Sequence, residues 1–315
     1  MPNVMVLAAP YAPPPPPEQP WVSTKLIWTG WDGTTWDLND GQSGVQVVSS
    51  GVVGLHLPPF EPQVSDRRTG RRRRGVRVRE RQVELPLLVW HDESSAEWVE
   101  RDRAFWRSFH PLRTGTLTVT TPGGVIRHLD VYLESDGGHA YDLDPVKKGW
   151  GLYNLVLTAE QPYWYGEPIT RSWGALETGL FFGGDDPDDP GAVETAPPLF
   201  ITSDSDTSNA FMPNPGDVAA WPVWTVEAAG SDVDITFGAV AASIGPPTIP
   251  DGQTLVVDTD PTIATARLNG VDVAGQVDPY NPKPIPAYSG SYLIITITGL
   301  GVVTVTITPR YLRAW

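Results

Sequence analysis

Short segments in which apolar and polar residues alternate recur along most of this chain, and each predicts a half-buried β-strand. Residues 76–90 alternate in this way. Leu117 and Val119 precede a Pro-Gly-Gly turn, which predicts a hairpin with residues 125–133. A further alternating strand is predicted within residues 149–166. The first half of the chain is therefore predicted to be rich in β-structure.

The same pattern continues from residue 197 to residue 315, where short alternating segments are separated by turns. Asn269-Gly270 and the Gly-Leu-Gly segment at 299–301 are strong turn signals. Many short strands with frequent turns are typical of a β-sandwich. The predicted fold class is mostly β, with a β-rich domain at 21–166 and a sandwich at 197–315.

One segment, residues 94–110, has the periodicity of an α-helix instead. Ser94 or Ser95 can cap its N-terminus, and Glu97 follows at a favourable distance for a capping box. Pro111 ends it. Its apolar residues recur with a spacing that gives one buried stripe: Trp98, Val99, Phe105, Trp106 and Phe109.

Two segments lack any periodicity and mark the ends of the predicted domains. Residues 1–20 contain the run YAPPPPPEQP, which predicts a stiff polyproline II arm, either solvated or lying on a neighbouring subunit. Residues 167–196 are predicted to be a linker, because 179–198 is rich in Gly, Asp and Pro. Its DDPDD run lacks the alternating ligands and the distant Glu of an EF-hand calcium loop.

The composition excludes several classes of protein. The chain has 315 residues and no cysteine, so it has neither disulfides nor thiolate metal sites. That absence fits assembly in a reducing cytoplasm. The N-terminus has no basic start, and no run of about 18 apolar residues exists, so we expect neither a secretory signal nor insertion into a membrane.

Charge is concentrated in one place. The formal net charge is −15, yet nine of the fifteen residues in RRTGRRRRGVRVRER (67–81) are arginine. Residues 67–75 hold no apolar side chain and predict a mobile loop. Beyond them a strand is predicted, with Arg77, Arg79 and Arg81 on its exposed face. The cluster is a solvated loop, a contact with protein carboxylates or a contact with nucleic acid.

The motifs of common enzymes are absent from the sequence. None of the five histidines has the spacing of a helical zinc pair, and neither a Gly-x-Ser-x-Gly elbow nor a phosphate-binding loop occurs. We therefore predict no catalytic residues, no metal and no cofactor. Trp221 and Trp224 could form a sugar-binding platform on the sandwich, and a role in the core or in a subunit contact is the competing interpretation.

The order of several segments resembles the distal tail protein family of long-tailed, non-contractile bacteriophages. The segments carrying the resemblance are WDGTTWDLNDG, GVVGLHLPP, RQVELPLLV, HPLRTGTLTVTTPGGVIRHLDVYL, LVLTAEQPYWYG, NPGDVAAWPVW and TLVVDTDPTIATARLNG. They extend from about residue 21 to residue 313. The family pattern does not explain the polyproline arm or the RRTGRRRRG insertion.

This resemblance implies a structural, non-enzymatic role at the tail tip of the virion, after assembly in the host cytoplasm. It implies a galectin-like C-terminal sandwich and a homohexameric ring that joins the tail tube protein to the tail-tip hub protein. The tape-measure protein is a further expected partner, and DNA passes through the ring without being read. A carbohydrate-binding adsorption module and a nucleic-acid binder are the alternative functions. The predicted partner or subunit contacts are Arg67, Arg68, Arg71, Arg72, Arg73, Arg74, Arg77, Arg79, Trp31, Trp36, Trp221 and Trp224.

Overall fold

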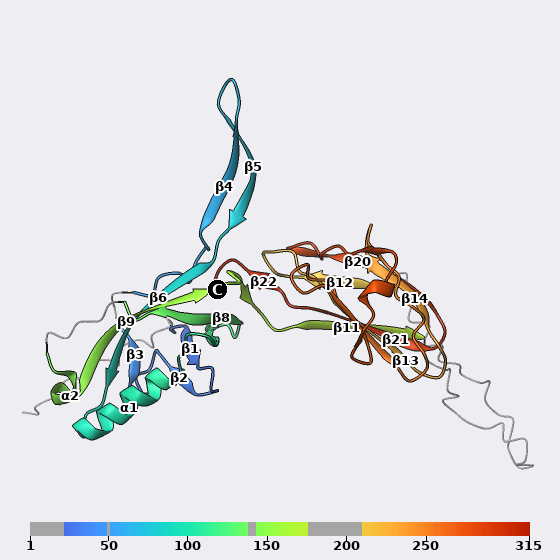
Figure 1. The fold of residues 1–315 in the computed structure, drawn as a ribbon. Coiled ribbons are helices and arrows are strands. Elements are labelled where there is room, and N and C mark those ends of the chain that lie inside the picture. The colour runs from blue at the N-terminus through green and yellow to red at the C-terminus, as the bar shows by residue number, and fades with distance from the viewer. Residues whose placement is uncertain (1–21, 49–50, 138–142, 176–209) are drawn as a thin grey trace, which may run out of the picture.

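The computed structural model describes residues 22–48, 51–137, 143–175 and 210–315, which form two β-rich domains and a projecting hairpin (Figure 1). The mostly-β fold class is confirmed. The predicted N-terminal polyproline arm lies outside the described residues, as does the segment from 176 to 209. None of the helices in the described part of the chain has the length and apolar character needed to cross a bilayer.

The N-terminal domain is built on a twisted antiparallel sheet with the strand order β2-β1-β7-β8-β9-β6-β3. Its longest pair is β6 with β9, in register from Arg81 opposite Ala159 to Trp90 opposite Trp150. The predicted Pro-Gly-Gly hairpin is present as β7 and β8. The strands of this sheet are β1 (Lys25–Thr29), β2 (Thr35–Asp37), β3 (Val45–Val47), β6 (Arg81–Trp90), β7 (Gly115–Thr120), β8 (Ile126–Ser135), β9 (Trp150–Ala159) and β10 (Trp164–Tyr165).

Helix α1 (Ser95–Arg107) lies along this sheet and confirms the predicted helix. Ser94 caps it by accepting the main-chain N–H of Glu97 at 3.2 Å. Phe105 is fully buried in the domain core, where its ring packs edge-on against Phe109. A short helix, α2 (Pro145–Lys148), precedes β9.

The C-terminal domain is a sandwich of two antiparallel sheets, as the alternation predicted. One sheet has the order β11-β21-β13-β16-β17-β18 and the other β12-β20-β14-β15-β19. Trp224 of one sheet stacks on Phe237 of the other, with ring centroids 4.5 Å apart, at the centre of the core. The strands are β11 (Ile169–Ala175), β12 (Phe211–Asn214), β13 (Val223–Ala228), β14 (Asp234–Ala239), β15 (Ser243–Ile244), β16 (Thr254–Asp258), β17 (Thr265–Leu268), β18 (Val271–Asp272), β19 (Tyr280–Asn281), β20 (Ser289–Thr298) and β21 (Gly301–Ile307), with a 3-10 turn at Ala274–Gln276.

Two stretches belong to different elements from those predicted. Residues 169–175 lie in the predicted linker but form β11, which pairs with β21 along its whole length. Its Thr170 and Ser172 hydroxyls meet Thr306 and Thr304 across the pair. At the other end, β22 (Arg310–Tyr311) leaves the sandwich and pairs with β10 of the N-terminal domain. The sandwich therefore starts before residue 197 and ends before residue 315.

The predicted loop at 67–75 is instead mostly one strand of a long hairpin. β4 (Phe60–Asp66) pairs with β5 (Arg71–Val78), and Arg67 to Gly70 form the turn. Gly70 has a φ of +84°, a conformation that glycine adopts easily. Arginine has no bias against strands strong enough to override pairing with β4, so composition alone was misleading here.

Candidate interaction surface

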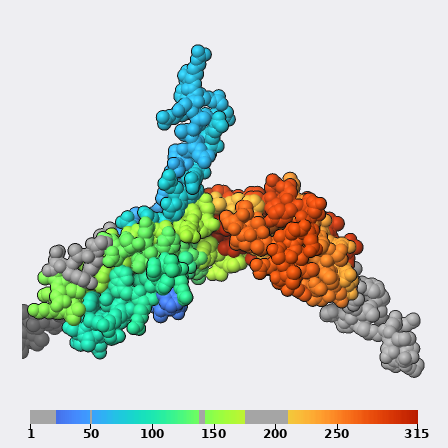
Figure 2. Space-filling view, in the orientation of Figure 1, coloured from blue at the N-terminus to red at the C-terminus, as the bar shows by residue number. Residues whose placement is uncertain are grey.

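We call residues 60–79 the arm. The arm stands away from both domains, and in the described structure its two strands pair only with each other (Figure 1, Figure 2). Between Gln63 and Val64 the register shifts, which leaves Arg74 without an opposite residue. Such a bulge increases the local twist of a hairpin. The arm thus presents both faces and both edges to its surroundings.

The arm carries all eight of the predicted arginine contacts, and all eight side chains are exposed. Two of them are paired within the arm: Arg71 Nε lies 3.1 Å from Asp66, and Arg79 donates to Glu61 at 3.0 Å. No carboxylate of the described residues lies within ion-pair distance of the other six: Arg67, Arg68, Arg72, Arg73, Arg74 and Arg77. These six guanidinium groups are available to a partner.

The four tryptophans predicted as contacts lie in different surroundings. Trp31 is 38% exposed, donates its indole N–H to Arg107 O at 2.9 Å and lies under the guanidinium of Arg113. Trp36 packs edge-on against Phe105 at the core of the N-terminal domain. Trp36 is only partly buried, so its role as a contact stays a prediction.

The tryptophan pair of the sandwich does not form an exposed platform. Trp224 is 1% exposed and belongs to the core, which corrects its prediction as a contact. Trp221 is half-buried and lies just before β13, which begins at Val223. Trp224 therefore offers no ring to a sugar or to another subunit.

The position of Arg81 differs from the prediction. It was expected on the exposed face of the strand with Arg77 and Arg79, but its side chain is 1% exposed. The chain bends between β5 and β6, and Arg81 begins the buried face of β6, two residues before Val83 and four before Leu85. The alternation of β6, extended backwards, is the signal that could have located it.

The guanidinium of Arg81 is held entirely by main-chain carbonyls. Its Nε donates to Pro162 O at 2.7 Å, and one Nη donates to Gly54 O at 2.6 Å and to His56 O. The other Nη donates to Leu312 O at 2.8 Å. Burial lowers the pKa of Arg81 to about 10, so the group is still cationic at neutral pH. One side chain thereby joins three segments that are far apart in the sequence.

We call residues 308–315, which run back from the sandwich onto the N-terminal domain, the C-terminal clasp. Ala314 is fully buried in the N-terminal core and donates its N–H to Leu55 O at 2.9 Å. The guanidinium of Arg127 lies 3.8 Å from the ring centroid of Tyr311 and donates to Arg313 O at 2.7 Å. The two domains are therefore joined both by the chain between β10 and β11 and by this returning segment.

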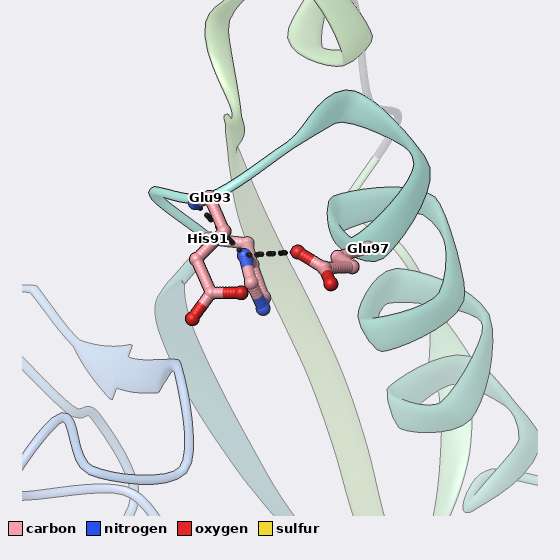
Figure 3. A group of neighbouring side chains, drawn as sticks. All are labelled: His91, Glu93 and Glu97. Carbon is pink, nitrogen blue, oxygen red and sulfur yellow. Dashed lines mark hydrogen bonds and ion pairs between the residues drawn. The ribbon is translucent and has the colours of Figure 1, made fainter.

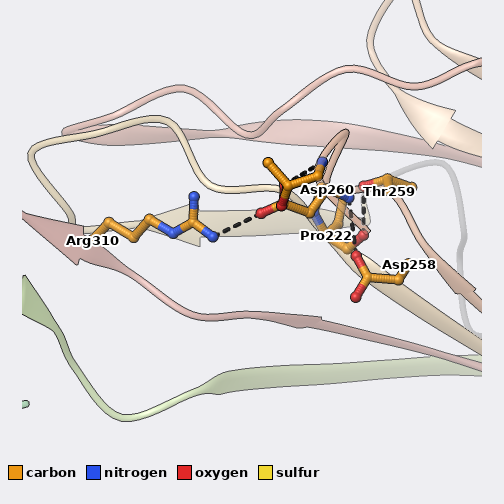
Figure 4. A network of polar contacts seen from close by, with 6 residues as sticks. Pro222, Asp258, Thr259, Asp260 and Arg310 are labelled. Carbon is orange, nitrogen blue, oxygen red and sulfur yellow. Dashed lines mark hydrogen bonds and ion pairs between the residues drawn. The ribbon is translucent and has the colours of Figure 1, made fainter. Parts of the chain in front are cut away.

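An ion pair ties the clasp to the sandwich as well. Arg310 donates to Asp260 at 2.8 Å, beside the Asp258–Asp260 turn (Figure 4). Burial would raise the pKa of Asp260, but hydrogen bonds from Thr262 and Arg310 outweigh it and hold the pKa below its usual value of 3.8. The carboxylate form of Asp260 is thus part of the folded structure.

A group of three possible metal ligands lies at the start of α1. Atoms of His91, Glu93 and Glu97 lie within 4.8 Å of one another (Figure 3). The carboxylate of Glu97, however, accepts the Ser94 hydroxyl at 3.2 Å, and His91 Nδ1 accepts the main-chain N–H of Glu93 at 3.2 Å. Capping of the helix and of the preceding turn accounts for this arrangement.

Comparison with known structures shows which proteins share this architecture. The structure is similar to the SPP1 Dit (gp 19.1) protein, described as a paradigm of hub adsorption apparatus in phages infecting Gram-positive bacteria, with a TM-score of 0.58 over 92% of this chain and 100% of that one, at 13% identity. The chain has the distal tail protein fold. Chains of the phage p2 baseplate in its activated conformation match at TM-scores of 0.52, with Sr, and 0.50, with Ca, each at 15% identity over 91% of this chain and 98% of that chain.

Sequence comparison gives a consistent result. The chain is 23% identical to minor tail protein Gp27 of Mycobacterium phage L5 over 332 residues, which cover 91% of this chain and 96% of that protein. No protein-family model matches the chain. The resemblance to distal tail proteins drawn from segment order is confirmed, and it extends over both domains.

Proposed function

We propose that this protein is a structural component of a bacteriophage tail tip. The observation that carries the proposal is the extent of the likeness: both domains, in the same order, match the whole of a phage distal tail protein. A tail protein of another phage is also similar over nearly its full length. Fold alone is a weak guide to function, but here fold and sequence point to the same kind of assembly.

We propose further that six copies form a closed ring between the tail tube protein and the tail-tip hub protein, with the tape-measure protein as another neighbour. Closed rings arise when each subunit uses two different surfaces to meet its neighbours. The N-terminal sheet with α1 would form the ring, the sandwich, galectin-like by resemblance, would point outward, and DNA would pass through the opening during ejection. This role is architectural and requires no catalysis.

The arm supplies the contact surface for this role. Its arginines extend beyond the body of the subunit, where they can reach acidic surfaces of the neighbouring subunit, the tube or the hub. Of the four tryptophans predicted as contacts, Trp31 is the one whose side chain is exposed, so it could join such a contact. With Trp224 in the core, the sugar-binding alternative loses one of the two residues that suggested it.

Imaging of the virion tests the proposal directly. Gold-labelled antibodies against the full-length chain should decorate intact particles at the distal end of the tail. Label on the capsid or along the tube would refute the tail-tip role. Cryo-electron microscopy of the same tails should show six copies around the axis, and a different copy number would overturn the hexamer while leaving the location intact.

A further inference from the structure

The two faces of the arm differ in chemistry. Residues opposite each other in an antiparallel pair share a face, so the register places Phe60 with Val78 and Pro62 with Val76 on one side. Val64 continues this face along β4 beyond the bulge, where it lies opposite Arg73. Glu61, opposite Arg77, lies on the other face. The apolar residues Phe60, Pro62, Val64, Val76 and Val78 therefore form a continuous strip, which we call the apolar stripe.

The apolar stripe is uncovered in the single subunit. Phe60 is 44% exposed, Val64 is 48% exposed and Val76 is 39% exposed. A two-stranded hairpin without a third strand or a helix beside it is at best marginally stable in water. Its bare edges also present unpaired main-chain groups. An ordered hairpin of this length with one apolar face is expected to be covered in its working state.

The positive charge of the arm indicates the kind of surface that covers the apolar stripe. The arm holds eight arginines and two acidic residues, whereas the rest of the chain holds fourteen basic and thirty-five acidic residues. The surface offered by another copy of the same chain is therefore strongly complementary to the arm. The arm cannot meet this surface on its own subunit, because it projects away from both domains.

We infer that the arm is an intersubunit clamp that docks on the acidic surface of a second copy of this chain. The apolar stripe packs on that copy, and the six unpaired arginines bind its carboxylates. Arginine suits this role because its planar fork can bind a carboxylate through two parallel hydrogen bonds. A nucleic-acid contact would use the arginines but leave the apolar stripe exposed. The inference rests on the proposed ring and names the partner of the arm within it.

A substitution that turns the arm into a cross-linking probe tests the clamp. In the full-length variant R72K/R73K/R77K the charge is kept and primary amines replace guanidinium groups, so a carbodiimide can join them to any carboxylate in direct contact. Mixing copies grown on ¹⁴N and ¹⁵N makes links between copies visible by mass spectrometry as peptide pairs of mixed isotope. We expect mixed pairs that join an arm lysine to an acidic residue outside the arm.

Two further variants separate charge from apolar packing. R72E/R73E/R77E should weaken self-association by about tenfold, since it sets like charges against each other in the contact. V64S/V76S should also weaken self-association. Because this variant removes apolar packing and no charge, added salt should not reproduce its effect. The matched control is R267E, which reverses an exposed arginine of β17 outside the arm and should leave self-association unchanged.

The outcomes separate this inference from the proposed function. If the purified chain does not self-associate, the lysine variant is cross-linked in assembled tails instead. Arm links to another tail protein, or oligomers that form with no arm links, would refute the clamp and leave the tail-tip role standing. Arm-dependent, salt-sensitive binding to duplex DNA without links between copies would also refute it. Absence of the chain from the tail tip would refute the proposed function itself.

Discussion

Replacing Arg81 by Met should loosen the attachment between the two domains. The substitution keeps an apolar stem but removes the donors to the carbonyls of Gly54, His56, Pro162 and Leu312. Four hydrogen bonds from a charged donor contribute roughly 6 kcal/mol at the lower end of their range. Those values are net of the cost of removing the guanidinium from water, a cost that also appears in the pKa of Arg81, which burial lowers from 12.5 to about 10. The free energy of unfolding should therefore fall by several kcal/mol, up to about 6 kcal/mol.

The assay has a global and a local readout. Denaturant titration of the full-length chain measures the free energy of unfolding. Hydrogen exchange measures the protection of the Ala314 amide, which bonds to Leu55 O in the clasp. In Arg81→Met that amide should exchange much faster. Arg313→Met is the matched control, because this neighbouring arginine is exposed, and it should change the unfolding free energy by less than about 0.5 kcal/mol.

An unchanged Ala314 amide would contradict the reasoning even if the protein were destabilised. Global destabilisation without local loosening would mean that Arg81 supports the N-terminal core and not the attachment of the clasp. Arg81→Lys adds a graded check. A single ammonium keeps the charge but cannot span all four carbonyls, so the lysine variant should fall between Met and the native chain.

Three further predictions use denaturant titration of single variants. Asp260 has a lowered pKa in the folded state, so its ion pair with Arg310 stabilises the fold above pH 3.8, and this stabilisation is lost as the pH falls further. Asp260→Asn should lower the free energy of unfolding by about 1–2 kcal/mol at neutral pH. A loss of the same size in acid would contradict this reasoning. Gly54→Ala should lower the free energy of unfolding by more than about 2 kcal/mol, because the φ of Gly54 is +93° and an added Cβ would lie 2.1 Å from a main-chain oxygen. An unchanged free energy of unfolding would show that the segment can shift. Trp28→Phe removes a 2.8 Å bond to the buried Ser108 hydroxyl and should cost about 1–3 kcal/mol, whereas Trp31→Phe at the exposed ring should cost less.

The sequence was a good guide wherever a pattern is local. Alternation and turn residues predicted the β7–β8 hairpin, and the Ser94–Glu97 spacing predicted the start of α1. These features depend on neighbours within a few residues, so they can be read without tertiary information.

Prediction failed where distant segments determine the structure. β11 was read as part of a linker because its partner, β21, lies some 130 residues later in the chain, as the Thr170–Thr306 contact shows. The clasp was missed for the same reason: residues 310–315 look like a final strand of the sandwich. Only the positions of Leu55 and Arg127 show that they belong to the other domain.

The arginine-rich segment shows how one residue type can have two unrelated roles within a few positions. Composition treats the nine arginines at 67–81 as a single basic cluster. Eight of them are exposed on the arm, where changing them removes little from the fold of the single subunit. The ninth, Arg81, is buried at the first position of β6 and bonds to carbonyls from three segments. Charge reversal on the arm should therefore impair association while the subunit stays folded, whereas the loss of Arg81 should impair the fold before any partner is involved.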